Sequence, residues 1–269
     1  MINCNFHTHC TFCDGADLAE DMVTAAIGQG LSALGFSSHS YNLPDLDFCM
    51  PRGMAANYQR EIARLKEKYQ GQIALFCGIE QDYYSEESTA PYEYVIGSVH
   101  SVRKEGRHLS VDHNAESLRY AVDSFYGGDF DRLAEEYFAL VGNVVQKTGA
   151  DIIGHFDLIS KFSEACGYGE SRRFLAAAED AVKRLIPSGA PFEVNTGAMA
   201  RGVRQVPYPS FAILKMIRQY GGDILFSSDC HSKTKLTFGF DQAEKLAVQA
   251  GFTSCLVWSK TGWQRVPLS

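Results

Sequence analysis

The chain lacks both a surplus of basic residues and any long apolar run. Its 269 residues carry 25 Lys and Arg against 32 Asp and Glu, a formal net charge of −7. A general nucleic-acid-binding surface is normally basic, so this balance argues against one. No segment approaches the roughly 18 consecutive apolar residues that a membrane helix needs. The N-terminus lacks a basic stretch followed by an apolar one, so we expect no signal peptide and a cytoplasmic protein.

The chain also lacks the cysteine pattern of a secreted disulfide scaffold. Its eight cysteines are dispersed over the whole length, whereas disulfide frameworks are dense in short chains. Cys10 and Cys13 form one Cys-x-x-Cys pair, but no second pair follows at zinc-ribbon spacing. We therefore expect reduced thiols at all eight positions instead of a structural zinc site.

What the chain does have is a regular alternation of strand and helix patterns, which indicates a largely parallel α/β architecture. The length suffices for one large barrel, and no repeat or linker divides it, so we expect a single domain over 1–269. Asp17 is the expected N-cap of the first helix. We expect the helices within 115–147 to cover the mouth of the barrel. Trp258 and Trp263 are expected to pack at the end of the barrel. The expected strands are 2–6, 33–36, 73–79, 94–99, 151–154, 192–194, 223–227 and 255–258, and the expected helices are 18–28, 55–69, 115–125, 130–147, 171–185, 210–220 and 241–249.

The most informative pattern is that His and acidic residues follow the short apolar runs. His7 and His9 form a His-x-His pair, and alternate residues of a strand share a face. Asp229 and His231 repeat this spacing after a later run. Other runs end at His39, Glu80, His100 and His155. The carboxyl ends of the strands form the active sites of (β/α) barrels. Imidazoles with a few carboxylates suit Zn, Fe or Mn, so the pattern predicts a multi-metal hydrolase.

Some of these residues have a structural alternative. His100 and His155 each stand alone, so a hydrogen-bonded core histidine is an alternative to a metal ligand at either position. Glu80 at a strand end would be costly to bury unpaired, and a metal would remove that cost. His108 and His113 lie in a polar stretch and are expected at the surface.

In their order along the chain, these segments resemble the polymerase-and-histidinol-phosphatase (PHP) family, most closely its monofunctional histidinol-phosphatase branch. The first and last motifs are typical of PHP proteins in general. The Gly-Ser-Val-His string at 97–100 and the Gly-His-Phe-Asp-Leu-Ile string at 154–159 indicate the phosphatase branch. The remaining matches are at 6–9, 37–39, 78–80, 193–196 and 228–231, so the resemblance covers nearly the whole chain.

The resemblance implies a distorted (β/α)7, TIM-like barrel that binds two to three divalent ions (Zn, Fe or Mn) in a trinuclear site. It assigns His7, His9, Glu80 and Asp229 to one ion, Glu80, His100 and His155 to a second, and Asp14, His39 and His231 to a third. Many relatives carry a His where this chain has Asp14. A carboxylate is a harder ligand than imidazole, so this difference favours Mn or Fe.

The resemblance also implies hydrolysis of L-histidinol phosphate to L-histidinol and phosphate, in histidine biosynthesis, through a metal-bridging hydroxide. Asp229 is expected to assist proton transfer, and Arg201 is expected to act in catalysis. Lys161, Arg201 and Arg204 are the expected phosphate contacts, because cationic donors suit phosphate oxygens. Solvated surface charge is the alternative for all three.

Other functions remain open at this stage. A PHP phosphoesterase that acts on another small phosphate, such as a nucleotide or sugar phosphate, would have the same metal ligands. A nuclease or proofreading module is disfavoured by the acidic balance and the lack of a basic, aromatic groove. A catalytically dead metal-binding protein is disfavoured by the complete ligand set. We expect a small phosphorylated substrate and no nucleic-acid, membrane or obligatory protein partner. Candidates for contacting its organic part are Tyr83, Tyr84, Tyr126 and Asp157.

Overall fold

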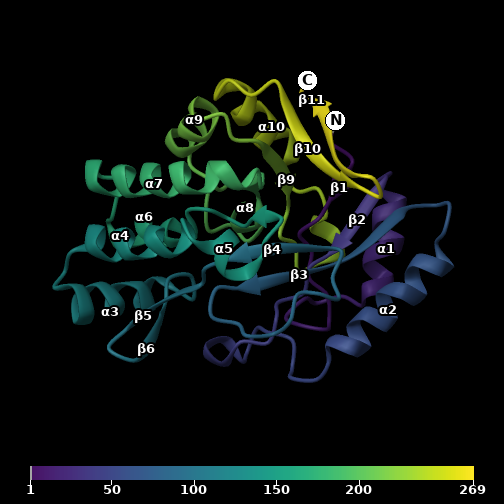
Figure 1. The fold of residues 1–269 in the computed structure, drawn as a ribbon, viewed down its shortest axis with the longest axis horizontal. Helices are drawn as coiled ribbons and strands as arrows, with labels where there is room; N and C mark the ends of the chain where they lie inside the picture. The colour runs from purple at the N-terminus through teal and green to yellow at the C-terminus, as the bar shows by residue number, and fades with distance from the viewer. Residues whose placement is uncertain (1) are drawn as a thin grey trace.

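A parallel β-sheet that curls into a barrel forms the centre of the computed structural model, which describes residues 2–269 (Figure 1). Within this range the sheet order is β1-β2-β3-β4-β7-β8-β9. The barrel closes where Thr8, just after β1, bridges to Cys230, just after β9. The predicted barrel is confirmed. Its strands are β1 (Cys4–Asn5), β2 (Ala33–Phe36), β3 (Ala74–Asp82), β4 (Tyr94–Ser98), β7 (Ile152–Ile153), β8 (Phe192–Asn195) and β9 (Ile224–Ser227).

Helices cover the outside of the barrel, as strands with two buried faces require. Figure 1 shows α3, α4 and α7 as a stack at one side and α1 and α2 at another. The helices are α1 (Ala19–Gly28), α2 (Ala55–Lys68), α3 (Ala115–Tyr126), α4 (Phe130–Val141), α5 (Val144–Thr148), α6 (Ser163–Cys166), α7 (Arg172–Leu185), α8 (Gly197–Ala200), α9 (Phe211–Gln219) and α10 (Phe240–Gln249). In the described part of the chain, no helix combines the length and apolarity of a membrane span.

Two predicted helix features differ in the structure. The helix expected over 130–147 is divided into α4 and α5, because Gly142 ends α4 and packs against α7, where a Cβ would lie 3.2 Å from Ala181 Cα. Asp17 does not cap α1, whose N-cap residue is Leu18. The Asp17 carboxylate instead accepts a hydrogen bond from the Lys233 backbone N–H at 2.9 Å. The Asp17 side chain therefore bonds a residue 216 positions away instead of the first turn of α1.

Two antiparallel hairpins lie outside the barrel sheet, and of their four strands the sequence predicted the one over 255–258. β5 (Ser101–Lys104) pairs with β6 (Arg107–Ser110) in the segment between β4 and β7. β10 (Ser254–Ser259) pairs with β11 (Gly262–Pro267) outside the barrel sheet. Trp258 and Trp263 lie edge to face at 4.7 Å on this second hairpin and pack against the apolar cluster inside the barrel. The predicted position of both tryptophans at the barrel end is confirmed.

The barrel interior is held together by the fully buried side chain of Tyr94. Its hydroxyl lies 2.6 Å from the Phe6 carbonyl and 3.0 Å from the Phe36 carbonyl, so β4 is tied to the ends of β1 and β2. Two glycines leave room for the ring. A Cβ at Gly78 would lie 2.3 Å from Tyr94 Cζ, and one at Gly35 would lie 2.4 Å from the hydroxyl oxygen.

Gly78→Ala is therefore expected to lower the free energy of unfolding by about 1–3 kcal/mol, because the added methyl group overpacks the interior. Gly28→Ala is the matched control: a Cβ there meets nothing within 4 Å at the end of α1. That substitution should be neutral or stabilise by up to about 1 kcal/mol. The measurement is the midpoint of urea denaturation followed by circular dichroism. Equal midpoints for the two variants would contradict the packing argument.

Candidate metal centre

The predicted ligands converge at the carboxyl edge of the barrel, although they come from segments spread over the whole sequence. The residues after β1, β2, β4, β7 and β9 and the end of β3 deliver their side chains to one place. The residues that meet there are His7, His9, Asp14, His39, Glu80, His100, His155, Asp229 and His231.

Glu80 lies at the centre of this cluster and is only 1% exposed. Its Oε2 and Oε1 atoms lie 3.0 to 3.4 Å from imidazole nitrogens of His7, His9, His39, His100 and His155. Ser98 Oγ also donates a hydrogen bond to Oε1 at 2.6 Å. Burial opposes ionisation, but the neighbouring His39 and His7 hold the Glu80 pKa well below its usual range. The carboxylate is therefore charged and can offer both oxygens.

Asp229 forms a second group with the His-x-His pair. Its Oδ1 lies 3.3 Å from His9 Nε2 and 3.7 Å from His7 Nε2. The backbone of Asp229 adopts a left-handed φ of 44°, which is uncommon for a residue with a side chain and tends to occur at functional sites. This conformation turns the carboxylate towards the two imidazoles directly after β9 ends.

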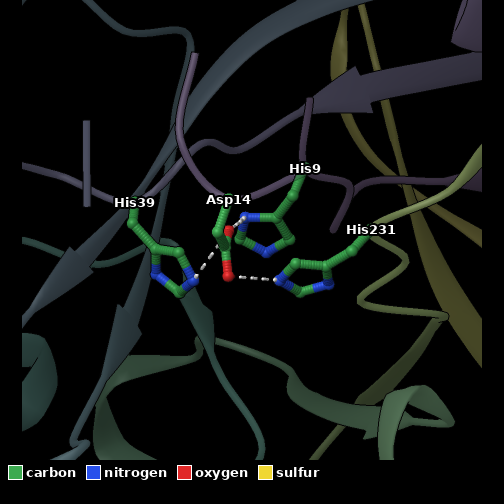
Figure 2. Close-up of side chains that lie close together, drawn as sticks. All are labelled: His9, Asp14, His39 and His231. Atoms are coloured by element: carbon green, nitrogen blue, oxygen red, sulfur yellow. Dashed lines mark ion pairs between the residues drawn. The ribbon is translucent and has the colours of Figure 1, made fainter. Parts of the chain in front are cut away.

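Asp14 forms a third group, which Figure 2 shows with its ion pairs. Asp14 Oδ2 lies 3.1 Å from His231 Nε2, and Oδ1 lies 3.8 Å from His39 Nε2. His9 also faces this group, with Nδ1 3.9 Å from Asp14 Oδ1. Asp14 thus lies among the ligands predicted for the third ion, and His9 lies between two groups.

The chemistry of these donors fits divalent metal ions. Three subsets have ligand atoms within 4.8 Å of one another: His9 with Asp14, His39 and His231; His7 with His9 and Asp229; and His39 with Glu80 and His100. His9 Nε2 and Asp14 Oδ1 are buried without a hydrogen-bond partner, which is unusual unless another group occupies that space. Burial, together with His231 and His39, lowers the pKa of His9 to about 3. The ring is therefore neutral and has a lone pair to donate.

A layer of carboxylates behind the histidines was not predicted. Glu193 on β8 is completely buried, and its Oε1 lies 2.6 Å from His7 Nδ1. Its Oε2 accepts hydrogen bonds from the His155 backbone N–H and from Asn195. Carboxylates that accept a hydrogen bond from a metal-binding histidine fix its tautomer and orientation. The available signal was a Glu inside the buried run of β8.

Asp82 has the equivalent position behind another histidine. Its Oδ2 lies 3.1 Å from His100 Nδ1, which leaves His100 Nε2 facing Glu80 at 3.4 Å. Two residues after Glu80, Asp82 shares the same face of β3. This spacing could have indicated its role.

The cluster forms one side of a cavity of about 320 Å³. Arg201 lines this cavity and is held by two of the predicted ligands: its Nη2 lies 3.2 Å from Asp229 Oδ2 and its Nη1 lies 3.3 Å from His231 Nδ1. Lys161 also lines the cavity, with Nζ 3.2 Å from Asp112 Oδ2. The helices expected within 115–147 as a cover contribute none of the described residues that line the cavity. Ser110, Asp112 and His113, from the end of β6 and the loop before α3, line it instead.

Arg204 lies behind the cavity wall. Its guanidinium binds Ser160, lies 4.0 Å from Asp157 Oδ2 and stacks 4.5 Å above the Tyr208 ring. Its side chain is 12% exposed. Among the described residues that line the cavity, Arg201 and Lys161 are present and Arg204 is not.

The residues considered for the organic part of a substrate also lie elsewhere. Of the described cavity-lining residues, none is Tyr83, Tyr84, Tyr126 or Asp157. Asp157 is completely buried beside Arg204. His113 is exposed as expected, but it also lines the cavity.

Cys10 and Cys13 are thiols, as predicted, and Cys13 Sγ lies 3.4 Å from His9 Nδ1.

Comparisons with known proteins agree with this geometry. The chain is 26% identical over 260 residues to the probable histidinol-phosphatase of Schizosaccharomyces pombe, covering 88% of this chain and 83% of that protein. It is 22% identical over 258 residues to the histidinol-phosphatase of Bacillus subtilis, covering 87% and 96%. The fold is similar, with a TM-score of 0.70 and 20% identity over 98% of this chain and 99% of that one, to the histidinol phosphate phosphatase of Lactococcus lactis subsp. lactis. The PHP domain model matches residues 5–197, well over half of the sequence, and the chain therefore belongs to the PHP family.

Proposed function

We propose that this protein hydrolyses L-histidinol phosphate to L-histidinol and phosphate, in histidine biosynthesis. The observation that carries the proposal is the convergence of imidazoles around the buried Glu80 carboxylate, beside a cavity with two cationic side chains. The names of the yeast and Bacillus relatives support it. The Lactococcus structure, described as a complex with Zn, L-histidinol and phosphate, supports the substrate.

We further propose that two to three divalent ions bind among these nine side chains, with the Glu80 carboxylate shared between two ions. Zn, Fe and Mn all accept imidazole and carboxylate ligands. Bound ions would lower the pKa of water and shield the charge of a phosphate. Residues 1–269 would form one domain around this centre.

The protein side chains have separate roles in this proposal. Arg201 stays charged, because burial of its guanidinium is outweighed by Asp229, which raises the Arg201 pKa. Its N–H groups that do not contact Asp229 can donate to phosphate oxygens, and Lys161 offers a second cation. Asp229 contacts both Arg201 and the His-x-His pair, which suits a residue that passes protons to or from the attacking water. Arg204, behind the wall, would support Ser160 and Asp157 instead of touching phosphate.

Substrate identity can be tested directly by comparing kcat/KM for histidinol phosphate with values for a panel of nucleotide, sugar and aryl phosphates. Histidinol phosphate should be the preferred substrate. A preference of about a hundredfold for another ester, near 2.7 kcal/mol of transition-state binding, would overturn the assignment.

Metal removal should abolish the activity. Protein purified after growth with Zn, Fe and Mn is expected to contain two to three equivalents of these metals by elemental analysis, because nine ligand side chains converge. Chelation should remove activity, and added Mn or Zn should restore it. Metal-free protein that retains full activity would contradict the proposal.

Arg201→Ala should lower kcat/KM by at least about tenfold, or about 1.4 kcal/mol of transition-state stabilisation, through loss of a phosphate donor. Arg265→Ala is the control, because Arg265 is exposed and pairs with Asp223 and Ser254 at the surface. Steady-state kinetics of both variants provide the measurement. Unchanged kinetics for Arg201→Ala would place its guanidinium outside the reaction.

Glu193→Gln should weaken metal binding by about 10–100-fold, the usual effect of losing a partner that orients a metal-binding histidine. The amide keeps the size of the side chain but no longer holds the His7 tautomer by charge. Competition with a chromogenic chelator measures the affinity. Glu179→Gln is the control, because Glu179 on α7 is half-exposed and pairs with Lys183 away from the cavity, and equal affinities for the two variants would contradict the orienting role.

A further inference from the structure

The cavity has a second wall whose residues do not belong to the metal centre. The loop after β2 contributes Phe48, the end of β6 and the following loop contribute Ser110, Asp112 and His113, and the segment around η2 (Leu158–Ser160) contributes Leu158 and Lys161. This wall combines one carboxylate, one ammonium group and apolar or aromatic surface. Any selectivity for the organic part of a substrate must come from such groups, because metal ions recognise only the phosphate.

Asp112 is the carboxylate on this wall. The other acidic residues of the cavity are committed elsewhere: Asp14, Glu80 and Asp229 face the histidine cluster, and Asp82 holds His100. Asp112 Oδ1 accepts a hydrogen bond from Ser110 Oγ at 3.2 Å, and Oδ2 accepts one from Lys161 Nζ at 3.2 Å. Its side chain is 22% exposed, so it remains accessible from the cavity.

We propose that Asp112 is a specificity-determining residue that binds the cationic organic part of the substrate, an inference that rests on the proposed function. The Asp112–Lys161 ion pair presents a negative and a positive group side by side in the same cavity. A substrate that carries both a phosphate and an ammonium or imidazolium group can replace both partners at once. Its phosphate would bind the Lys161 ammonium group in place of Asp112, and its cationic group would bind the Asp112 carboxylate in place of Lys161.

This exchange explains how the site would reject simpler phosphate esters. An ester with an uncharged organic part draws Lys161 towards its phosphate and leaves Asp112 without a counter-charge. A buried or half-buried charged group that loses its partner costs free energy, so the neutral ester is penalised. Sites that hydrogen-bond a polar substrate group reject analogues without it far more strongly than apolar pockets reject small size differences.

The aromatic edge of the same wall suits a flat ring. Phe48 and His113 both line the cavity, with ring centroids 5.9 Å apart at 65°, and His113 directly follows Asp112 in the sequence. An imidazole ring can pack against Phe48 while its N–H or the nearby ammonium group reaches Asp112. The wall therefore offers an aromatic face and a carboxylate, which are the two groups that bind a small aromatic cation.

The experiment compares histidinol phosphate with phenyl phosphate, an ester that has an aromatic ring but no cation. Asp112→Asn keeps the shape of the side chain and removes its charge, and Asp123→Asn, on the exposed face of α3, is the charge-matched control. In Asp112→Asn, kcat/KM for histidinol phosphate should fall by at least about tenfold, whereas the value for phenyl phosphate should stay the same or rise, because the variant has no charge at position 112 to leave unpaired. Inhibition by L-histidinol should weaken in parallel, and inhibition by inorganic phosphate should not.

The phenyl phosphate rate in the same preparation shows whether the variant is folded and loaded with metal. Equal losses for both esters, or no loss for either, would overturn the role of Asp112 and leave the proposed function intact. A wild-type protein that hydrolyses phenyl phosphate but not histidinol phosphate would overturn both proposals. Asp123→Asn should behave as the wild type with both esters, and a matching loss there would attribute the effect to net charge and so overturn the proposal.

Discussion

The site depends on one carboxylate, Glu80, that is held charged in the interior of the barrel. Removing an ionised carboxylate from water is strongly unfavourable unless other groups replace its hydration. Here five imidazoles from four strand ends and the Ser98 hydroxyl surround it. Each of these groups is useful only if the strands end at the same level, so the geometry of the barrel and the charge of Glu80 are linked.

Contacts in the barrel interior, beneath the ligands, keep the strand ends at the same level. Tyr94 ties β4 to the ends of β1 and β2 through two carbonyls that come just before the histidine segments. The bridge between Thr8 and Cys230 then closes the sheet between the His-x-His pair and the Asp229–His231 pair. A rigid apolar interior directly beneath the ligands limits their movement, and precise placement of ligands is what both metal affinity and catalysis need.

The cavity also shows how an acidic protein can receive a phosphate. The net charge is −7, yet Arg201 and Lys161 both line the cavity beside the proposed metal ions. Each cation is held by a carboxylate, Asp229 for Arg201 and Asp112 for Lys161. These pairs keep the cations in place and make the local field, instead of the overall charge, decide which ligand enters.

The sequence by itself determined the parallel α/β class and most of the metal-ligand candidates, because both follow from short-range periodicity: apolar runs form the strands, and the polar residues that follow them reach the carboxyl edge. The seven-stranded barrel and Asp14 came from the resemblance to the PHP family. It could not determine the partners behind those ligands. Glu193 meets His7 across 186 positions, and Lys161 meets Asp112 across 49. Arg201 and Arg204 are three positions apart, but the turn after α8 sends one into the cavity and the other behind its wall. Only the tertiary structure decided these points, because they depend on which strand ends become neighbours when the sheet closes.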